Sequence, residues 1–301
     1  MTTATDTDKR RQLLRDGFCL FEQILDPDLL KLTREISDTL LDGQPPEHFE
    51  QQKSTGSMIS VFDDPGFAEL VRCPAAVDAL ASLGFPRPKW WLGFVISKPP
   101  HSPPLFWHQD WWGWNHPVSY GDPVPQQVFL MYYTVDTAPG NGCLRLIPGS
   151  HLQRHPMHDA VPDAHTNALR QIEDSRSPVY RNVEEAVDVP VRAGDLVIGD
   201  SRLLHSAHAN DSAERRTVIT LWYFPAFEQL PESIRAHIVT EKKIDTWPEE
   251  ARSRIAHLLP EYDGGTEPIE WNRVPGPDLE ASPGHSRTAQ EIGNRERTSV
   301  T

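Results

Sequence analysis

Apolar residues in the first 88 positions recur at the spacing of amphipathic helices. Leucines and an isoleucine repeat every three or four residues over 29–41, and the repeat ends before Gly43. Asp26 followed by Pro27 supplies an N-cap with proline at the first helical position. Similar patterns predict a short strand over 18–21 and two further helices, over 7–16 and 66–83.

From Lys89 onward the pattern changes to short apolar runs bounded by turn residues, which is typical of strands. Eight short strands with irregular connections predict a protein that is mainly β with flanking helices. The core would be a jelly roll, the cupin-like double-stranded β-helix in which two sheets face each other. The expected strands are 90–97, 105–110, 126–136, 143–147, 187–191, 195–199, 204–208 and 216–224.

These patterns divide the chain into one domain and a tail. The domain covers 1–263, and residues 264–301 are rich in Pro, Gly, Ser and charge, which predicts a weakly packed or disordered tail. Within the domain we expect a helical part over 1–88, a jelly-roll core over 89–225 and C-terminal helices over 226–263.

Two polar stretches are expected to be loops. Residues 44–60 contain two prolines, which favours a surface loop over a mobile flap near a pocket. Residues 151–180 form the longest insert between strands and hold four of the 13 histidines. A solvated loop near a pocket mouth is favoured over a metal cluster for this insert. Its histidines are His151, His155, His158 and His165.

Composition and charge narrow the range of partners. The chain has 29 basic and 43 acidic residues, a formal net charge of −14, which argues against nucleic acid and anionic membranes. No apolar run approaches the roughly 18 residues of a membrane helix. The three cysteines lack metal-type spacing, and charged residues near the N-terminus do not fit a secretory signal. We therefore expect a cytoplasmic protein.

Candidate chemistry starts at His108 and Asp110. Two residues apart, they would lie on the same side of an extended segment and reach one metal ion. A second histidine, His205, follows an apolar strand about a hundred residues later, and Arg216 comes eleven residues after it. Two histidines and one carboxylate are the ligands of non-haem Fe(II) oxygenases.

These segments, together with Asn141 to His151, resemble the phytanoyl-CoA dioxygenase family of Fe(II)/2-oxoglutarate oxygenases. The resemblance covers roughly residues 90–225. It implies that His108, Asp110 and His205 bind Fe(II), and that 2-oxoglutarate and O2 are cosubstrates. His208 is the rival ligand, but on a strand it would point away from His205.

The resemblance also assigns the cosubstrate pocket. It implies that Arg216 binds the distal carboxylate of 2-oxoglutarate, because a guanidinium can hold a carboxylate with two parallel hydrogen bonds. Its neighbour Arg215 should face away. On strand 126–136 both faces are apolar, and the family favours the odd-numbered face as the inner one. Gln127, Met131 and Tyr133 would then contact cosubstrate or substrate.

Trp112 and Trp114 are candidates for the substrate wall. In the related ectoine hydroxylases an aromatic residue four positions after the metal aspartate contacts substrate, and Trp114 holds that place. The rest of that motif is missing here, so ectoine itself is not the expected substrate. Packing of the two tryptophans at the barrel mouth remains the alternative.

The implied reaction is oxidation of a small organic molecule, such as a biosynthetic intermediate, with release of succinate and CO2. Hydroxylation is the expected outcome, while desaturation or epoxidation would use the same residues. A halogenase is disfavoured because Asp110 is present. Two non-oxygenase alternatives are a hydrolytic zinc enzyme and a jelly-roll protein that binds a metal or small molecule without turnover. The oligomeric state is not indicated.

Overall fold

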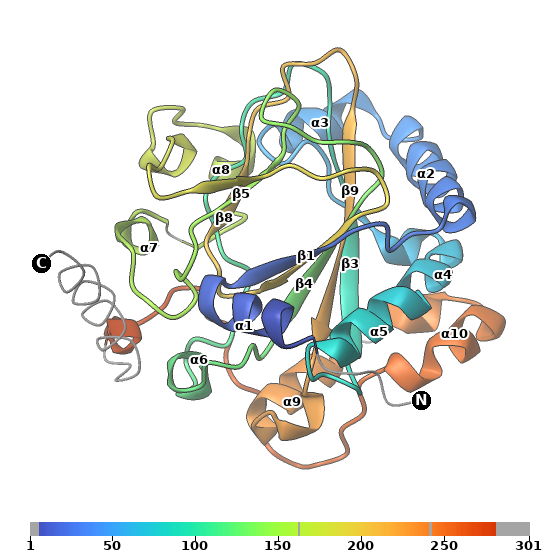
Figure 1. The fold of residues 1–301 in the computed structure, drawn as a ribbon, viewed down its shortest axis with the longest axis vertical. Coiled ribbons are helices and arrows are strands. Elements are labelled where there is room, and N and C mark those ends of the chain that lie inside the picture. The colour runs from blue at the N-terminus through green and yellow to red at the C-terminus, as the bar shows by residue number, and fades with distance from the viewer. Residues whose placement is uncertain (1–5, 162, 241–242, 281–301) are drawn as a thin grey trace, which may run out of the picture.

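A computed structural model describes residues 6–161, 163–240 and 243–280. In that part of the chain, antiparallel strands form two sheets, and helices lie outside them (Figure 1). The larger sheet has the order β1-β7-β4-β9-β3-β2 and the smaller has the order β6-β5-β8. This is the jelly-roll arrangement that the short, irregularly connected strands predict.

The strands are β1 (Phe18–Phe21), β2 (Ile59–Ser60), β3 (Lys89–Lys98), β4 (Val128–Tyr133), β5 (Leu144–Leu146), β6 (Val187–Val189), β7 (Leu196–Asp200), β8 (His205–Ala207) and β9 (Arg216–Phe224). The α-helices are α1 (Thr7–Asp16), α2 (Pro27–Asp42), α3 (Pro46–Gln51), α4 (Ala68–Val71), α5 (Pro74–Ser82), α6 (Val118–Gly121), α7 (Pro156–Ala160), α8 (Asn167–Gln171), α9 (Glu232–Thr240) and α10 (Glu249–Ile255).

The central strand β4 explains why both of its faces are apolar. Val128, Leu130 and Tyr132 pack in the cluster between the large sheet and the helices that cover it, including α2, α4, α5 and α10 (Figure 1). Phe129 and Met131, on the other face, belong to the cluster between the two sheets. Since every side chain of β4 is buried, hydrophobicity alone does not identify the inner face.

Several expected segments differ in the structure. Residues 44–60, expected as a loop, contain α3 and β2, and residues 151–180, also expected as a loop, contain α7 and α8. The single helix predicted over 66–83 is split into α4 and α5, because Pro74 lacks the backbone N–H that would continue the helix. Residues 105–110 are not a ladder strand and form one isolated bridge, between His108 and His205. Their backbone instead bonds to several segments, and Trp107 N, for example, donates to Val179 O of the 151–180 insert.

The stretch 264–280, expected to belong to a weakly packed tail, makes specific contacts. Asn272 forms a bridge with Gly113, and the ring of Trp271 stacks on Trp112 with centroids 5.4 Å apart and planes at 7°. Aromatic and backbone groups therefore hold this segment although few of its residues are apolar. The remainder of the expected tail, 281–301, lies outside the described residues.

Within the described residues, no helix is both long enough and apolar enough to cross a membrane.

Candidate active site

The two histidines of the predicted metal site are joined through their own backbones. His108 N donates to His205 O at 3.0 Å, and His205 N donates to His108 O at 2.8 Å. Asp110 is held nearby because its N–H donates to Ser201 O at 2.7 Å, just before β8. The isolated bridge thus places all three residues on one scaffold without a continuous strand.

The two imidazoles each face one oxygen of the Asp110 carboxylate. His108 Nε2 lies 3.7 Å from Asp110 Oδ1, and His205 Nε2 lies 3.7 Å from Asp110 Oδ2. Each Nδ1 is 3.0 Å from a backbone carbonyl two residues earlier, that of Phe106 or of Leu203. Because a carbonyl only accepts, each Nδ1 carries the proton and each Nε2 keeps its lone pair for a metal.

The carboxyl of Asp110 is buried yet ionised. Burial raises the pKa of Asp110, but its polar neighbours, among them His165 and the charged Arg273, outweigh burial and hold the pKa below its ordinary value. In addition, Trp222 Nε1 donates to Asp110 Oδ2 at 2.9 Å. Burial in turn holds the pKa of His108 well below its ordinary value, so the imidazole is neutral. An anionic carboxylate and neutral imidazoles are the forms that bind a divalent ion.

His165 is a member of the site that the sequence did not assign. Its Nε2 lies 4.0 Å from Asp110 Oδ1, and its ring packs edge-on against His108 with centroids 4.8 Å apart. With His108 and Asp110 it forms a group whose ligand atoms all lie within 4.8 Å of one another, and His205 is not part of that group. The four histidines of the 151–180 insert were the available signal, but spacing could not show that the insert folds back onto the ligands.

A cavity of about 360 Å³ opens beside these ligands. Gln127, Met131 and Tyr133 line it, as the odd-numbered face of β4 was expected to do. Pockets for small organic molecules have volumes of about 300–1,000 Å³. The cavity is therefore of a size for a small cosubstrate and a small substrate.

Polar groups without partners point to an absent ligand. Within the described residues, both side-chain polar atoms of Gln127, the Nε of Arg216 and the hydroxyl of Thr220 are buried with no hydrogen-bond partner. All three residues line the cavity. Since buried polar atoms are rarely left unpaired, the donor set fits a cosubstrate with carboxylate and carbonyl oxygens.

Arg216 and Arg215 point in opposite directions at the start of β9. Arg216 is buried on the cavity wall, and burial lowers the pKa of its guanidinium. Arg215 pairs outside with Asp42 at 2.5 Å and with Asp38 at 3.8 Å. The inward arginine is therefore the one that the spacing from His205 selected.

Trp112 and Trp114 are not among the cavity-lining residues, contrary to the expected substrate wall. Both are buried in a cluster with C-terminal residues, and the ring of Trp112 stacks on His237 at 4.3 Å. The tryptophans that line the cavity are Trp91, Trp222 and Trp271. The two expected residues instead support this wall from behind, because Trp112 also stacks on Trp271.

His208 lies away from the cavity and pairs with Asp188 at 2.5 Å. Cys143 joins them in a second group of metal-binding geometry. Burial raises the pKa of the Cys143 thiol to about 11, so this sulfur is protonated near neutral pH. The group therefore has the features of a hydrogen-bonded histidine and aspartate beside a thiol.

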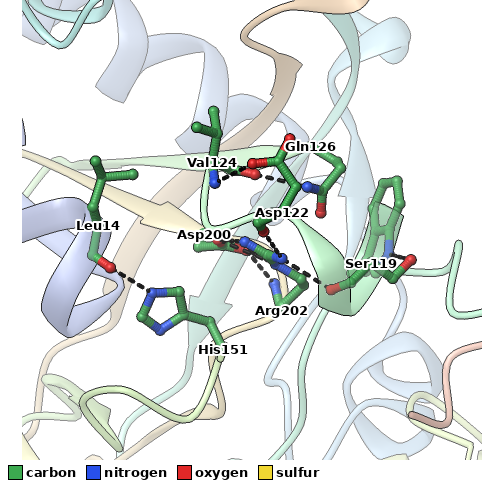
Figure 2. A network of polar contacts seen from close by, with 9 residues as sticks. Leu14, Ser119, Asp122, Val124, Gln126, His151, Asp200 and Arg202 are labelled. Atoms are coloured by element: carbon green, nitrogen blue, oxygen red, sulfur yellow. Dashed lines mark hydrogen bonds and ion pairs between the residues drawn. The ribbon is translucent and has the colours of Figure 1, made fainter. Parts of the chain in front are cut away.

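A buried ion pair fixes the turn that leads into β8. Arg202 Nη2 and Asp200 Oδ2 are 2.6 Å apart, and both side chains are almost fully buried. Figure 2 shows that Arg202 also reaches the segment around Ser119 and Asp122, where its Nη1 donates to both backbone carbonyls at 2.9 and 2.8 Å. This network holds the backbone from which His205 extends.

Comparison with known proteins gives one family match and several relatives. The profile of the phytanoyl-CoA dioxygenase (PhyH) family matches residues 13–218. L-proline trans-4-hydroxylase from Streptomyces griseoviridis is 28% identical over 229 residues, which is 69% of this chain and 82% of that protein. Ectoine dioxygenase from Nocardia farcinica is 27% identical over 252 residues, 74% and 78% of the two chains.

Solved structures agree on the fold. HygX from Streptomyces hygroscopicus, with nickel and 2-oxoglutarate bound, has a TM-score of 0.55 and 18% identity, covering 74% of this chain and 88% of that chain. EctD from S. alaskensis, with bound Fe, has a TM-score of 0.53 and 18% identity, covering 77% of this chain and 81% of that chain. At these identities the likeness shows that the chains share a fold.

Proposed function

This chain belongs to the phytanoyl-CoA dioxygenase family and is an Fe(II)/2-oxoglutarate-dependent dioxygenase, and we propose that His108, Asp110 and His205 hold its iron. One observation carries this assignment. The three side chains converge beside the same cavity into which the unpaired Arg216 faces. A site that only bound a metal would not need a second cation on the cavity wall.

Bound Fe(II) supplies the redox chemistry by which O2 and 2-oxoglutarate yield succinate, CO2 and an oxidised substrate. The chain's residues position the reactants. Arg216 would hold the distal carboxylate of 2-oxoglutarate, while Gln127 and Tyr133 offer further polar contacts. Aromatic and aliphatic residues make up most of the remaining wall and would exclude water from the reacting groups.

The substrate is a small organic molecule, and we propose hydroxylation as the outcome. L-proline trans-4-hydroxylase and ectoine dioxygenase act on small molecules, and the cavity volume of about 360 Å³ supports a substrate of similar size. Asp110 occupies the position that a halide would need, which disfavours halogenation. Three free, buried cysteines support a reducing cytoplasm, and the net charge of −14 argues against a nucleic-acid partner.

The metal assignment is tested by alanine substitution. His108→Ala, Asp110→Ala and His205→Ala should each remove Fe(II) binding in an equilibrium titration while the folded far-UV circular dichroism spectrum persists. His165→Ala and His208→Ala should keep most of the binding, because neither supplies a ligand in this assignment. Loss of iron binding in His165→Ala, with iron binding retained in His205→Ala, would mean that His165 of the insert is the third ligand in place of His205.

The cosubstrate assignment is tested with a pair of adjacent arginines. Arg216→Lys keeps the charge and loses the two parallel hydrogen bonds. It should weaken 2-oxoglutarate binding by roughly ten- to a hundredfold, since a charged hydrogen bond contributes about 1.5–3 kcal/mol. The anaerobic Fe(II) complex would be titrated through its metal-to-ligand absorption band. Arg215→Lys is the control. Equal weakening of 2-oxoglutarate binding in both variants would mean that Arg216 does not hold the distal carboxylate of the cosubstrate.

A further inference from the structure

The segment around Trp271 brings a second arginine to the cavity. Asn272 N donates to Trp112 O at 2.8 Å, and Trp114 N donates to Asn272 O at 3.3 Å. These bonds attach the segment to the residues just after Asp110. Trp271 and Arg273, on either side of Asn272, both line the cavity. A stretch more than 150 residues after Asp110 in sequence thus forms part of the wall beside it.

The guanidinium of Arg273 contacts an aromatic ring but forms no hydrogen bond or ion pair with the described residues. Its Nε is buried without a hydrogen bond, and across the described residues its side chain forms no ion pair. Its ring contact is with Trp271, 5.1 Å from the guanidinium carbon to the ring centroid. The backbone of Arg273 is fixed separately, because its carbonyl accepts a hydrogen bond from Gln109 Nε2. A cation held in this way beside a cavity is available to a ligand.

The two cavity arginines lie in different surroundings. Burial lowers the pKa of each. Arg216 lies near Tyr133 and Cys143, which carry no charge near neutral pH, whereas the carboxylates of Asp110 and Asp163 act on Arg273. Arg216 is therefore placed for the cosubstrate. Arg273 lines the same cavity as Asp110, so a molecule that it binds would lie beside the proposed metal site. It is the second guanidinium on the cavity wall.

We propose that Arg273 binds the carboxylate of the substrate, so that the enzyme oxidises small organic acids with an apolar body. This inference rests on the proposed function and adds the substrate class. The unpaired guanidinium supplies the carboxylate site. Trp271 and Trp91 on the same wall supply flat apolar surfaces for the body of the molecule. Arg273 would act as a specificity-determining residue.

The test compares acids with their own primary amides. A panel of graded size, from cyclopentanecarboxylate and its carboxamide to phenylacetate and phenylacetamide, would be titrated into the anaerobic protein with Fe(II) and saturating 2-oxoglutarate. Saturation keeps Arg216 occupied. Tryptophan fluorescence reports binding, because three tryptophans line the cavity. At least one acid should bind the unmodified protein about 10- to 100-fold more tightly than its amide.

Arg273→Gln should reduce that ratio to near one while leaving the affinity for the amide unchanged. Arg273→Lys should retain part of the preference, because it keeps the charge without the planar fork. Arg215→Gln, which alters an exposed arginine, is the matched control and should keep the full ratio. A merely structural role of Arg273 would weaken acid and amide equally.

Two results would overturn the proposal: no acid in the panel binds more tightly than its amide, or the preference survives in Arg273→Gln. The absorption band of the Fe(II)/2-oxoglutarate complex separates this inference from the proposed function. That band should be unchanged in Arg273→Gln. If the unmodified protein formed no band, the proposed function would fail, and the fluorescence comparison of acid and amide would still decide the role of Arg273.

Discussion

Asp110 divides its two carboxylate oxygens between different neighbours. Oδ1 lies 3.7 Å from His108 Nε2 and 4.0 Å from His165 Nε2, while Oδ2 lies 3.7 Å from His205 Nε2 and accepts from Trp222 Nε1 at 2.9 Å. Among these neighbours the indole can only donate. The hydrogen bond from Trp222 therefore fixes the plane of the carboxylate, and with it the direction of the oxygen that would bind iron in the proposed assignment.

Trp222→Phe should keep the packing of the ring and remove this hydrogen bond. Loss of such a supporting bond weakens metal binding by about 10- to 100-fold, and we expect that decrease in Fe(II) affinity. Competition with a chromophoric chelator would measure it. Trp114→Phe is the control, because the Nε1 of Trp114 has no partner among the described residues. Unchanged affinity in Trp222→Phe would mean that the imidazoles alone orient Asp110.

Sequence reasoning predicted those residues of the candidate site whose proposed roles depend on local spacing. His108 and Asp110 are two residues apart, and Arg216 differs from Arg215 by the alternation of a strand. Contacts between distant segments were not predictable in this way. Trp222 bonds to Asp110 across 112 residues, and His165 reaches the site from the insert. No periodicity reports such contacts, and for the same reason Trp112 and Trp114 were wrongly expected on the substrate wall.

At the scale of elements, the turn between β7 and β8 connects the large sheet to the small one. Ser201 O in this turn accepts from both Asp110 N and Trp111 N, at 2.7 and 2.8 Å. The ion pair of Asp200 with Arg202 stabilises the same turn from inside the protein. The turn therefore positions His205 and Asp110 together, although they come from different parts of the chain.

Arg202→Met should destabilise the fold strongly, since it leaves the Asp200 carboxylate buried without its partner. Breaking a buried pair costs about 3–5 kcal/mol of unfolding free energy. Urea unfolding followed by circular dichroism would measure the loss. Arg215→Met breaks an exposed pair with Asp42 and should cost less than about 1 kcal/mol. A similar small loss in both variants would show that water reaches the turn.

Elements were predictable where a period or a cap identified them. The helix that begins after Asp26 and strand β9, Arg216–Phe224, lie where the patterns placed them. Segment 105–110 was predicted as a strand because it is a short apolar run bounded by turn residues, but its backbone bonds go to several different partners. Strand formation requires a continuous neighbour, and a local pattern contains no information about that neighbour.

At the scale of the whole molecule, segments outside the sheets complete the site. The 151–180 insert contributes Asp163 and His165, and the C-terminal segment contributes Trp271 and Arg273. Both were predicted as loops or tail because their composition is polar. A polar composition predicts weak independent packing, but it does not exclude hydrogen bonding to a wall built by the rest of the chain. The jelly-roll core was therefore predictable, while the closure of its mouth was not.

The insert also makes the stability of the whole protein sensitive to acid. His158 is buried and caps α7, where its Nδ1 accepts from His155 N at 3.0 Å. Burial is the main cause that lowers the pKa of His158 to about 4, from an ordinary value of 6.5. Protonation would place a charge inside the protein and remove the acceptor of the cap.

His158 should therefore contribute stability that is complete above about pH 6.5 and declines as the pH falls toward 4. In this window the unfolded chain binds a proton that the folded chain does not, so the free energy of unfolding rises with pH. One such group accounts for up to about 1.4 kcal/mol per pH unit, about 3 kcal/mol over the window.

His158→Gln should remove this contribution, which urea unfolding at several pH values would measure. Other buried histidines remain, so the free energy of unfolding should still depend on pH in His158→Gln. The slope of that dependence should fall by the equivalent of at most one bound proton. The exposed His257, changed to Gln, is the control and should keep the slope of the unmodified protein. An equal slope in His158→Gln would mean that His158 is protonated in the folded state.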